Sequence, residues 1–187
     1  IMQEIEFNRR GYELYLKALR LYENLWQWLE RFPAFAKKGL FKATDLLNSD
    51  FHKEYLRRLA ANQEPFWGTA VAFSDHQKEK LLTNEFKTNF YHSSSYDTIK
   101  NYYDELKKID DSADFLKRIT YLEIKHRLPE FLLARADKMT MAHSVEGRVP
   151  FLEKRLVELA MQIPAEIKLK NGETKHILKE AVKGAVK

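Results

Sequence analysis

Hydrophobic residues recur at spacings of three and four along most of this chain, and that period predicts amphipathic helices. Residues 37–48 and 84–95 lack the period, and we interpret them as a break and a loop. The pattern therefore predicts an all-α fold. The predicted helices cover residues 4–31, 50–59, 74–82, 96–108 and 112–127, a segment from Pro129, residues 150–160, and a last segment from about Thr174.

Several helix starts carry recognisable capping residues. Asp50 precedes an amphipathic segment and is expected to cap it, because a carboxylate can accept from the free N–H groups of a first turn. Ser74 and Gln77 have the spacing of a capping box. Pro129 and Pro150 are each placed in a first helical turn, where the missing N–H is not needed.

Composition narrows the class of protein. The chain has 187 residues, of which 44% are hydrophobic and 13% aromatic, so it is not expected to be disordered. The net charge is +5, and the densest basic clusters, at residues 78–80 and 153–155, each contain an acidic residue. We therefore expect a solvated surface and no nucleic acid partner. The absence of cysteine excludes disulfides, thiolate metal sites and cysteine nucleophiles.

Nothing in the sequence indicates a membrane or export segment. No apolar run approaches the roughly 20 residues that a spanning helix needs. The first residues also lack the features of a signal peptide. The sequence therefore predicts a cytoplasmic chain without a membrane partner.

Five charged residues lie among apolar ones in a short stretch. Because an unpaired buried charge costs several kcal/mol, such residues are expected to be paired. One interpretation is a structural ion-pair network that holds a non-helical crossing between two helices. The other is the wall of a ligand pocket. The five residues are Arg135, Asp137, Lys138, Glu146 and Arg148.

Lys175 is expected in the first turn of the last helix, after a turn at Asn171 and Gly172. A cation there opposes the helix dipole, which costs a few tenths of a kcal/mol. With a bound anion, however, the ammonium and the backbone N–H groups would act together. Lys175 is therefore either a plain surface residue or part of an anion site. No metal site is predicted, because no two of the three histidines considered are three or four residues apart; these are His126, His143 and His176.

Two blocks resemble the synthetase domain of the glutamine-dependent asparagine synthetases. Residues 135–153, RADKMTMAHSVEGRVPFLE, are similar to the family's D-[RK]-M-S-M-A and V-E-A-R-x-P-F-L-D patterns. Residues 174–179, TKHILK, resemble its T-K-x-[IL]-L-[RK] pattern. Gly11 and Tyr12 resemble the end of its D-E-x-F-x-G-Y pattern.

The resemblance implies that residues 1–187 are the C-terminal helical portion of an α/β adenine-nucleotide α-hydrolase-like (PP-loop) synthetase domain. It implies that the complete enzyme uses ATP and Mg²⁺ to adenylate aspartate. Ammonia from glutamine then converts the β-aspartyl-AMP to asparagine. A homodimer is compatible with the resemblance.

Particular roles also follow from the resemblance alone. Lys175 matches the lysine that neutralises charge on the α-phosphate transition state and departing pyrophosphate. The resemblance also implies that the five charged residues contact the substrate or the nucleotide. Glu146 and Arg148 are in addition expected to pair with each other and so to fix the chain before Pro150.

Three departures from the family qualify these expectations. The S-G-G-x-D-S loop that binds ATP is absent, and so is the catalytic cysteine of the glutaminase domain. The chain is therefore expected to be a fragment that binds no cofactor and is inactive alone. Leu132 stands where some members have a carboxylate, three residues before Arg135. Two milder differences are Gly147 in place of the usual alanine and Glu153 in place of the usual aspartate.

Alternatives remain open from the sequence. A second carboxylate-activating enzyme of the same family, such as a β-lactam synthetase-like enzyme or a polysaccharide amidotransferase, would carry similar blocks. A non-catalytic helical interaction module is the alternative from another class. The acceptor carboxylate, the nitrogen source and the oligomeric state are not set by these residues.

Overall fold

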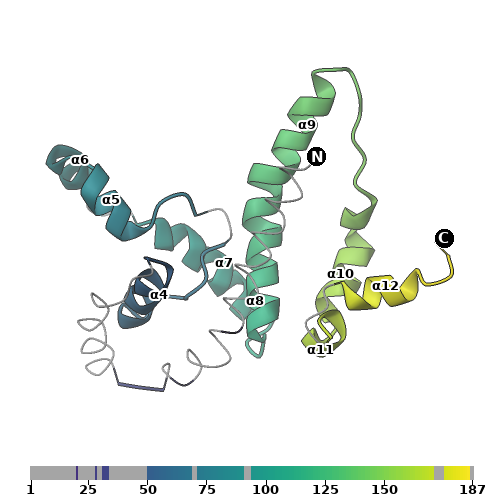
Figure 1. The fold of residues 1–187 in the computed structure, drawn as a ribbon, viewed down its shortest axis with the longest axis horizontal. Coiled ribbons are helices and arrows are strands. Elements are labelled where there is room, and N and C mark those ends of the chain that lie inside the picture. The colour runs from purple at the N-terminus through teal and green to yellow at the C-terminus, as the bar shows by residue number, and fades with distance from the viewer. Residues whose placement is uncertain are drawn as a thin grey trace. The chain divides into compact units, whose positions relative to one another are not determined.

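The computed structural model describes residues 20, 28, 31–33, 50–68, 71–90, 94–170 and 175–185. These residues form helices and connecting turns, with no β-strand among them beyond isolated bridge residues at Lys170 and Lys183 (Figure 1). The predicted all-α fold is thus confirmed for the described part of the chain. The predicted helix over residues 4–31 and the break over residues 37–48 lie outside the described residues, apart from the few positions named above.

The chain divides into two compact units, residues 1–128 and 129–187. The helices that begin in the first unit are α4 (Asp50–Ala60), α5 (Asp75–Leu81), α6 (Asn84–Asn89), α7 (Ser95–Ile109), α8 (Phe115–Leu122) and the π-helical η3 (Glu123–Leu133). Those of the second unit are α9 (Ala134–Met141), the 3₁₀ turn η4 (Pro150–Leu152), α10 (Lys154–Gln162), α11 (Ala165–Lys168) and α12 (His176–Ala181).

Two predicted features of the first unit are confirmed in detail. At α5, the Ser74 hydroxyl accepts from the Gln77 N–H at 3.2 Å, and the Ser74 N–H donates to Gln77 Oε1 at 2.9 Å. These reciprocal bonds are the predicted capping box. In α7, the residues of the predicted apolar stripe, Ile99, Tyr103 and Leu106, are buried.

The prediction of a loop over residues 84–95 is wrong, because α6 occupies its first half. Thr83 caps this helix by accepting from the Phe86 N–H at 3.2 Å. The rings of Phe86 and Phe90 stack with centroids 4.4 Å apart, one turn away from each other. None of the α6 residues is buried, so the helix carries no apolar stripe that the sequence pattern could reveal.

The predicted boundary at Pro129 is also wrong. The helix expected over residues 112–127 begins at Phe115, where the Asp114 carboxylate accepts from the Lys117 N–H at 2.7 Å. It then continues without a break as η3, which contains Pro129 in its interior. A proline has no N–H to donate in a regular α-helix, and a wider π-helical stretch accommodates it here.

The last helices also start later than predicted. Pro150 opens the short η4 turn, and α10 begins only at Lys154, with the Glu153 carboxylate accepting from the Leu156 N–H at 3.0 Å. The sequence pattern did not indicate α11. The last helix begins at His176, so Lys175 precedes it as the N-cap residue.

The core of the first unit lies where α7 packs against α8. Ile119 and Leu122 of α8 are fully buried. The Tyr103 hydroxyl donates to the Phe66 carbonyl oxygen at 2.8 Å and so ties the segment after α4 to α7. The other buried apolar residues in the described part of the chain are Tyr55, Leu59, Phe66, Trp67, Phe115 and Leu116.

A buried ion pair joins this core and was not predicted. Glu54 and Arg58 are one turn apart on α4, and Arg58 Nη2 lies 3.3 Å from Glu54 Oε1. Arg58 Nη1 also donates to the Pro65 carbonyl oxygen at 2.8 Å. Its guanidinium lies 4.0 Å from the centroid of the Trp67 ring. Burial lowers the pKa of Arg58, while the Glu54 carboxylate acts in the opposite direction.

Candidate functional site

The six residues singled out from the sequence lie in the second unit, and all six are exposed. Arg135, Asp137 and Lys138 are on α9. Glu146 and Arg148 are in the connection between α9 and η4, which Figure 1 shows as an extended segment. Lys175 is the N-cap residue of α12.

Of the ion-pair network that one interpretation of the sequence expects, the described residues form a single exposed pair. Arg148 Nε lies 3.2 Å from Glu146 Oε1, with the two side chains 85% and 74% exposed. An exposed pair of this kind contributes only about 0–1 kcal/mol. The Arg135 guanidinium lies 4.8 Å from the Phe131 ring centroid. Asp137 and Lys138 form no ion pair within the described part of the chain.

A Schellman-type turn ends α9 and directs the connection that follows it. The Val145 N–H donates to the Thr140 carbonyl oxygen and the Ser144 N–H to that of Met141, both at 3.0 Å. Ser144 has a φ of 57°, the left-handed conformation that glycine usually supplies at this position. This turn places Gly147 beside Thr140. A Cβ at residue 147 would lie 3.5 Å from Thr140 Oγ1, an ordinary contact, so the alanine typical of the family fits here.

Replacing Ser144 by glycine should therefore stabilise the protein by about 0.5–1 kcal/mol, because glycine adopts this conformation without strain. A larger gain is not expected, since glycine also loses more backbone entropy on folding. The neighbouring Ala142 has right-handed helical angles, so Ala142→Gly should destabilise by a similar amount. Urea unfolding of both variants checks the opposite signs, and a loss of stability in Ser144→Gly would contradict the prediction.

Lys175 does not lie inside the first turn of the last helix, as expected, but precedes it as the N-cap residue. Its φ is 54° and its ψ is 28°, a left-handed conformation that costs a non-glycine residue about 1–2 kcal/mol. Its carbonyl oxygen accepts from the Lys179 N–H at 3.0 Å and so begins the helix. Because α12 has only six residues, its dipole adds little, and the expected attraction for an anion rests mainly on the Lys175 ammonium.

The structure does not join Lys175 to the five charged residues near α9. Among the described residues, no hydrogen bond, ion pair or ring contact connects them. The main contacts between elements in this unit are those of α10 with η4 and of α11 with α12. The candidate residues therefore form two surface groups with no direct bond between them in the described part of the chain.

The described residues contain no group of three or more histidine, aspartate or glutamate side chains that could hold a metal ion. None of their helices is long and apolar enough to cross a membrane.

A cavity of about 360 Å³ lies in the first unit. Its walls include none of the six candidate residues, and sequence reasoning missed it because its lining comes from four separate segments.

Comparison with known proteins places these observations in a family. The sequence model of the asparagine synthase family matches residues 7–187. Over 178 residues the chain is 33% identical to asparagine synthetase (glutamine-hydrolysing) 1 of Bacillus subtilis, an alignment that covers 94% of this chain and 26% of that protein. No solved structure is significantly similar to the chain.

Shorter alignments reach other proteins. The chain is 37% identical over 75 residues to human asparagine synthetase (glutamine-hydrolysing), covering 40% of this chain and 12% of that protein. It is 39% identical over 70 residues to amidase chry2 of Gibberella zeae, covering 34% of this chain and 10% of that protein. The chain thus spans about a quarter of the Bacillus subtilis relative and less of the other two.

Proposed function

Because this chain belongs to the asparagine synthase family, we propose that it is the C-terminal helical part of a glutamine-hydrolysing asparagine synthetase. The observation that carries the proposal is the similarity over 94% of the chain to a protein of that name. The complete protein would form asparagine from aspartate with ATP, and with nitrogen from glutamine or ammonia. The ATP-binding loop and the glutaminase nucleophile would be provided by other parts of the protein.

The second unit has the surface expected of a part that packs on something larger. None of its described residues is buried to the degree of the core residues in the first unit. Met139 and Phe151 are 64% and 66% exposed, and Val145, Val149 and Leu159 are also exposed. Exposed apolar residues in this number, on a unit without a buried core among its described residues, are typical of a surface that further polypeptide covers. This supports a domain that further polypeptide completes.

Lys175 is the catalytic residue that we propose. ATP would supply the adenylyl group that activates the aspartate carboxylate. The Lys175 side chain is exposed and has no ion-pair partner among the described residues, so its ammonium is available to a phosphate oxygen. At 4 Å and an effective dielectric constant near 20, that attraction is about 4 kcal/mol before desolvation. An attraction that grows as charge develops stabilises the transition state selectively.

The other candidate residues would mainly hold the chain in place or contact other parts of the complete domain. Glu146 and Arg148 would fix the connection before Pro150. Asp137 and Lys138, which are exposed on α9, would contact the nucleotide-binding half, and Arg135 the substrate or nucleotide. For Mg²⁺ we assign no ligand to this chain, because the described residues hold no suitable group of side chains. We further propose a cytoplasmic enzyme, with a homodimer as a compatible assembly.

The test is an assay of the full-length protein with aspartate, ATP, Mg²⁺ and glutamine. Asparagine should form together with equimolar AMP and pyrophosphate, because the adenylyl group is the one transferred. Replacing glutamine by an ammonium salt identifies the nitrogen sources that the enzyme accepts. Formation of ADP and phosphate, or no asparagine with either nitrogen source, would contradict the proposal.

A second candidate is an amide-forming enzyme of this family with a different carboxylate, such as a β-lactam synthetase-like enzyme or a polysaccharide amidotransferase. The similarity to a protein named as an amidase favours keeping this candidate. Exchange of labelled pyrophosphate into ATP, measured with a panel of carboxylates, would distinguish the two. Exchange that depends on another acid but not on aspartate would favour the second candidate. No exchange with any acid would favour a non-catalytic module.

A further inference from the structure

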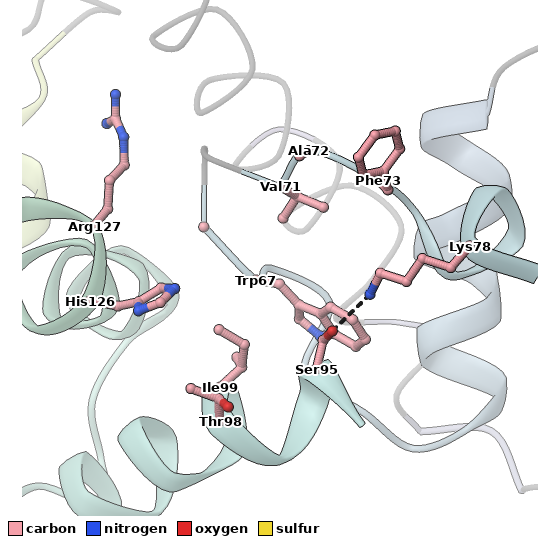
Figure 2. A pocket seen from close by; sticks show the side chains of 11 residues that line it. Trp67, Val71, Ala72, Phe73, Lys78, Ser95, Thr98, Ile99, His126 and Arg127 are labelled. Atoms are coloured by element: carbon pink, nitrogen blue, oxygen red, sulfur yellow. Dashed lines mark hydrogen bonds between the residues drawn. The ribbon is translucent and has the colours of Figure 1, made fainter. Parts of the chain in front are cut away.

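The cavity of the first unit lies beneath the segment that follows α4 and between α5, α7 and η3. Figure 2 shows the Trp67 ring between Lys78 and Ser95, which lie together on one side, and His126 on the other. The remaining lining is mostly apolar and consists of Val71, Ala72, Phe73 and Ile99, with Thr98, Gly68 and Arg127 completing it. A volume of about 360 Å³ is in the range of small-molecule sites.

The Trp67 ring is held in place from outside the cavity. Its Nε1–H donates to the Glu64 carbonyl oxygen at 2.8 Å. The Tyr96 ring stacks on it with centroids 5.5 Å apart, and the buried Arg58 guanidinium lies 4.0 Å from its centroid. A flat apolar wall is therefore already formed before any ligand arrives, which lowers the ordering cost of binding.

One wall of the cavity carries the donors. Lys78 Nζ donates to Ser95 Oγ at 2.7 Å and to Asp75 Oδ1 at 3.1 Å. An ammonium has three N–H groups, so one remains for a further acceptor. Because Ser95 Oγ accepts from Lys78, its own hydroxyl proton is free to be donated. Thr98, three residues further along α7, adds a second hydroxyl on the same helix face.

The lining contains no acidic side chain. Asp75 and Glu123, which pair with Lys78 and Arg127, are not part of the lining. The Arg127 Nε–H is buried and has no hydrogen-bond partner among the described residues. The cavity thus presents cationic and hydroxyl donors on a largely apolar surface, and the nearby carboxylates of Asp75 and Glu123 are each paired with a cation.

We propose that this cavity binds a small carboxylate with an aromatic or branched aliphatic body. The carboxylate would accept from Lys78 Nζ and from the Ser95 and Thr98 hydroxyls, while the apolar body would lie against Trp67 and Ile99. None of these residues belongs to the two sequence blocks assigned to synthesis. The proposal does not rest on the proposed function, and its test involves neither ATP nor asparagine.

The first experiment titrates the full-length protein with phenylacetate and follows both binding heat and ligand-observed NMR. A ligand of this size should bind with a Kd of about 1 mM. The neutral analogue phenylacetamide tests the carboxylate, and acetate and inorganic phosphate test the apolar body. Each should bind at least about tenfold more weakly than phenylacetate. The proposal would be overturned if any of these three control ligands bound as tightly as phenylacetate. It would also be overturned if phenylacetate did not bind at about 20 times the expected Kd.

Variants locate the binding. In ¹H–¹⁵N spectra, phenylacetate should shift the indole signal that disappears in Trp67→Phe. Ala72→Phe adds a ring at an exposed lining position and should weaken binding at least about tenfold by filling the cavity. Unchanged affinity in that variant would overturn the proposal.

The charge is tested with a matched pair on α5. Lys78→Gln should weaken phenylacetate at least about fivefold and leave phenylacetamide unchanged. Lys80→Gln makes the same charge change at an exposed position outside the lining and should alter neither. An equal loss in both variants would mean that net charge alone attracts the acid, and would overturn the site. Thermal unfolding of each variant confirms that the fold is retained.

Discussion

Replacing Lys175 by alanine in the full-length protein should abolish amide synthesis while leaving glutamine hydrolysis intact. Removing one charged donor from a transition state typically costs about 10²–10³-fold in kcat. The exposed Lys175 ammonium has no ion-pair partner among the described residues, so its loss should leave the packing of α11 and α12 unchanged. Synthesis and glutaminase rates, measured on the same preparation, check the prediction.

Two further variants separate charge from backbone strain. Lys175 has a left-handed conformation, so Lys175→Gly should relieve strain and yet be as inactive as the alanine variant. Lys183 is also exposed and lies just after α12, where it pairs with Glu180 at 3.0 Å. Lys183→Ala should retain normal synthesis. Near-normal synthesis in Lys175→Ala would refute the assignment of Lys175.

The largest expected loss of stability is at the buried pair on α4. Arg58→Met keeps the side-chain volume but leaves the Glu54 carboxylate buried without its cation. It also removes the donor to the Pro65 carbonyl and the cation over Trp67. Breaking a buried pair by removing one partner costs about 3–5 kcal/mol. Urea unfolding followed by circular dichroism should show this loss in the free energy of unfolding.

The neighbouring residue provides the control. Arg57 pairs with Glu79 across the surface, where the two side chains are 31% and 60% exposed. Arg57→Met should therefore cost less than about 1 kcal/mol. The double variant Glu54→Leu and Arg58→Met should recover much of the loss of Arg58→Met, because no unpaired charge remains. A similar small loss in Arg57→Met and Arg58→Met would contradict a buried, structural pair.

Local signals in the sequence predicted part of the fold correctly. The capping box at Ser74 and the buried stripe of α7 depend on residues within a few positions of each other, and both are confirmed. The prediction of a loop over residues 84–95 is wrong because it relied on the same kind of local signal, the period of the apolar residues. α6 buries none of its residues, so only its terminal residues, such as the cap at Thr83, indicated a helix.

The sequence did not show which charged residues would be buried. Glu54 and Arg58 have the same one-turn spacing as Lys100 and Asp104, whose side chains are about half exposed. The difference comes from Trp67 and Pro65, which the chain brings over α4 after a turn. The opposite error concerns the five charged residues near α9. The sequence predicted them to be paired among apolar neighbours, but all five are exposed.

The sequence by itself determined the helical class and the family, because amphipathic period and the blocks over residues 135–153 and 174–179 are properties of neighbouring residues. The family assignment is confirmed by the match over residues 7–187. Tertiary structure alone decided which charges are buried and which side chains surround the cavity beside Trp67. These features depend on residues that are distant in sequence and meet only when the helices pack, so no local pattern specifies them.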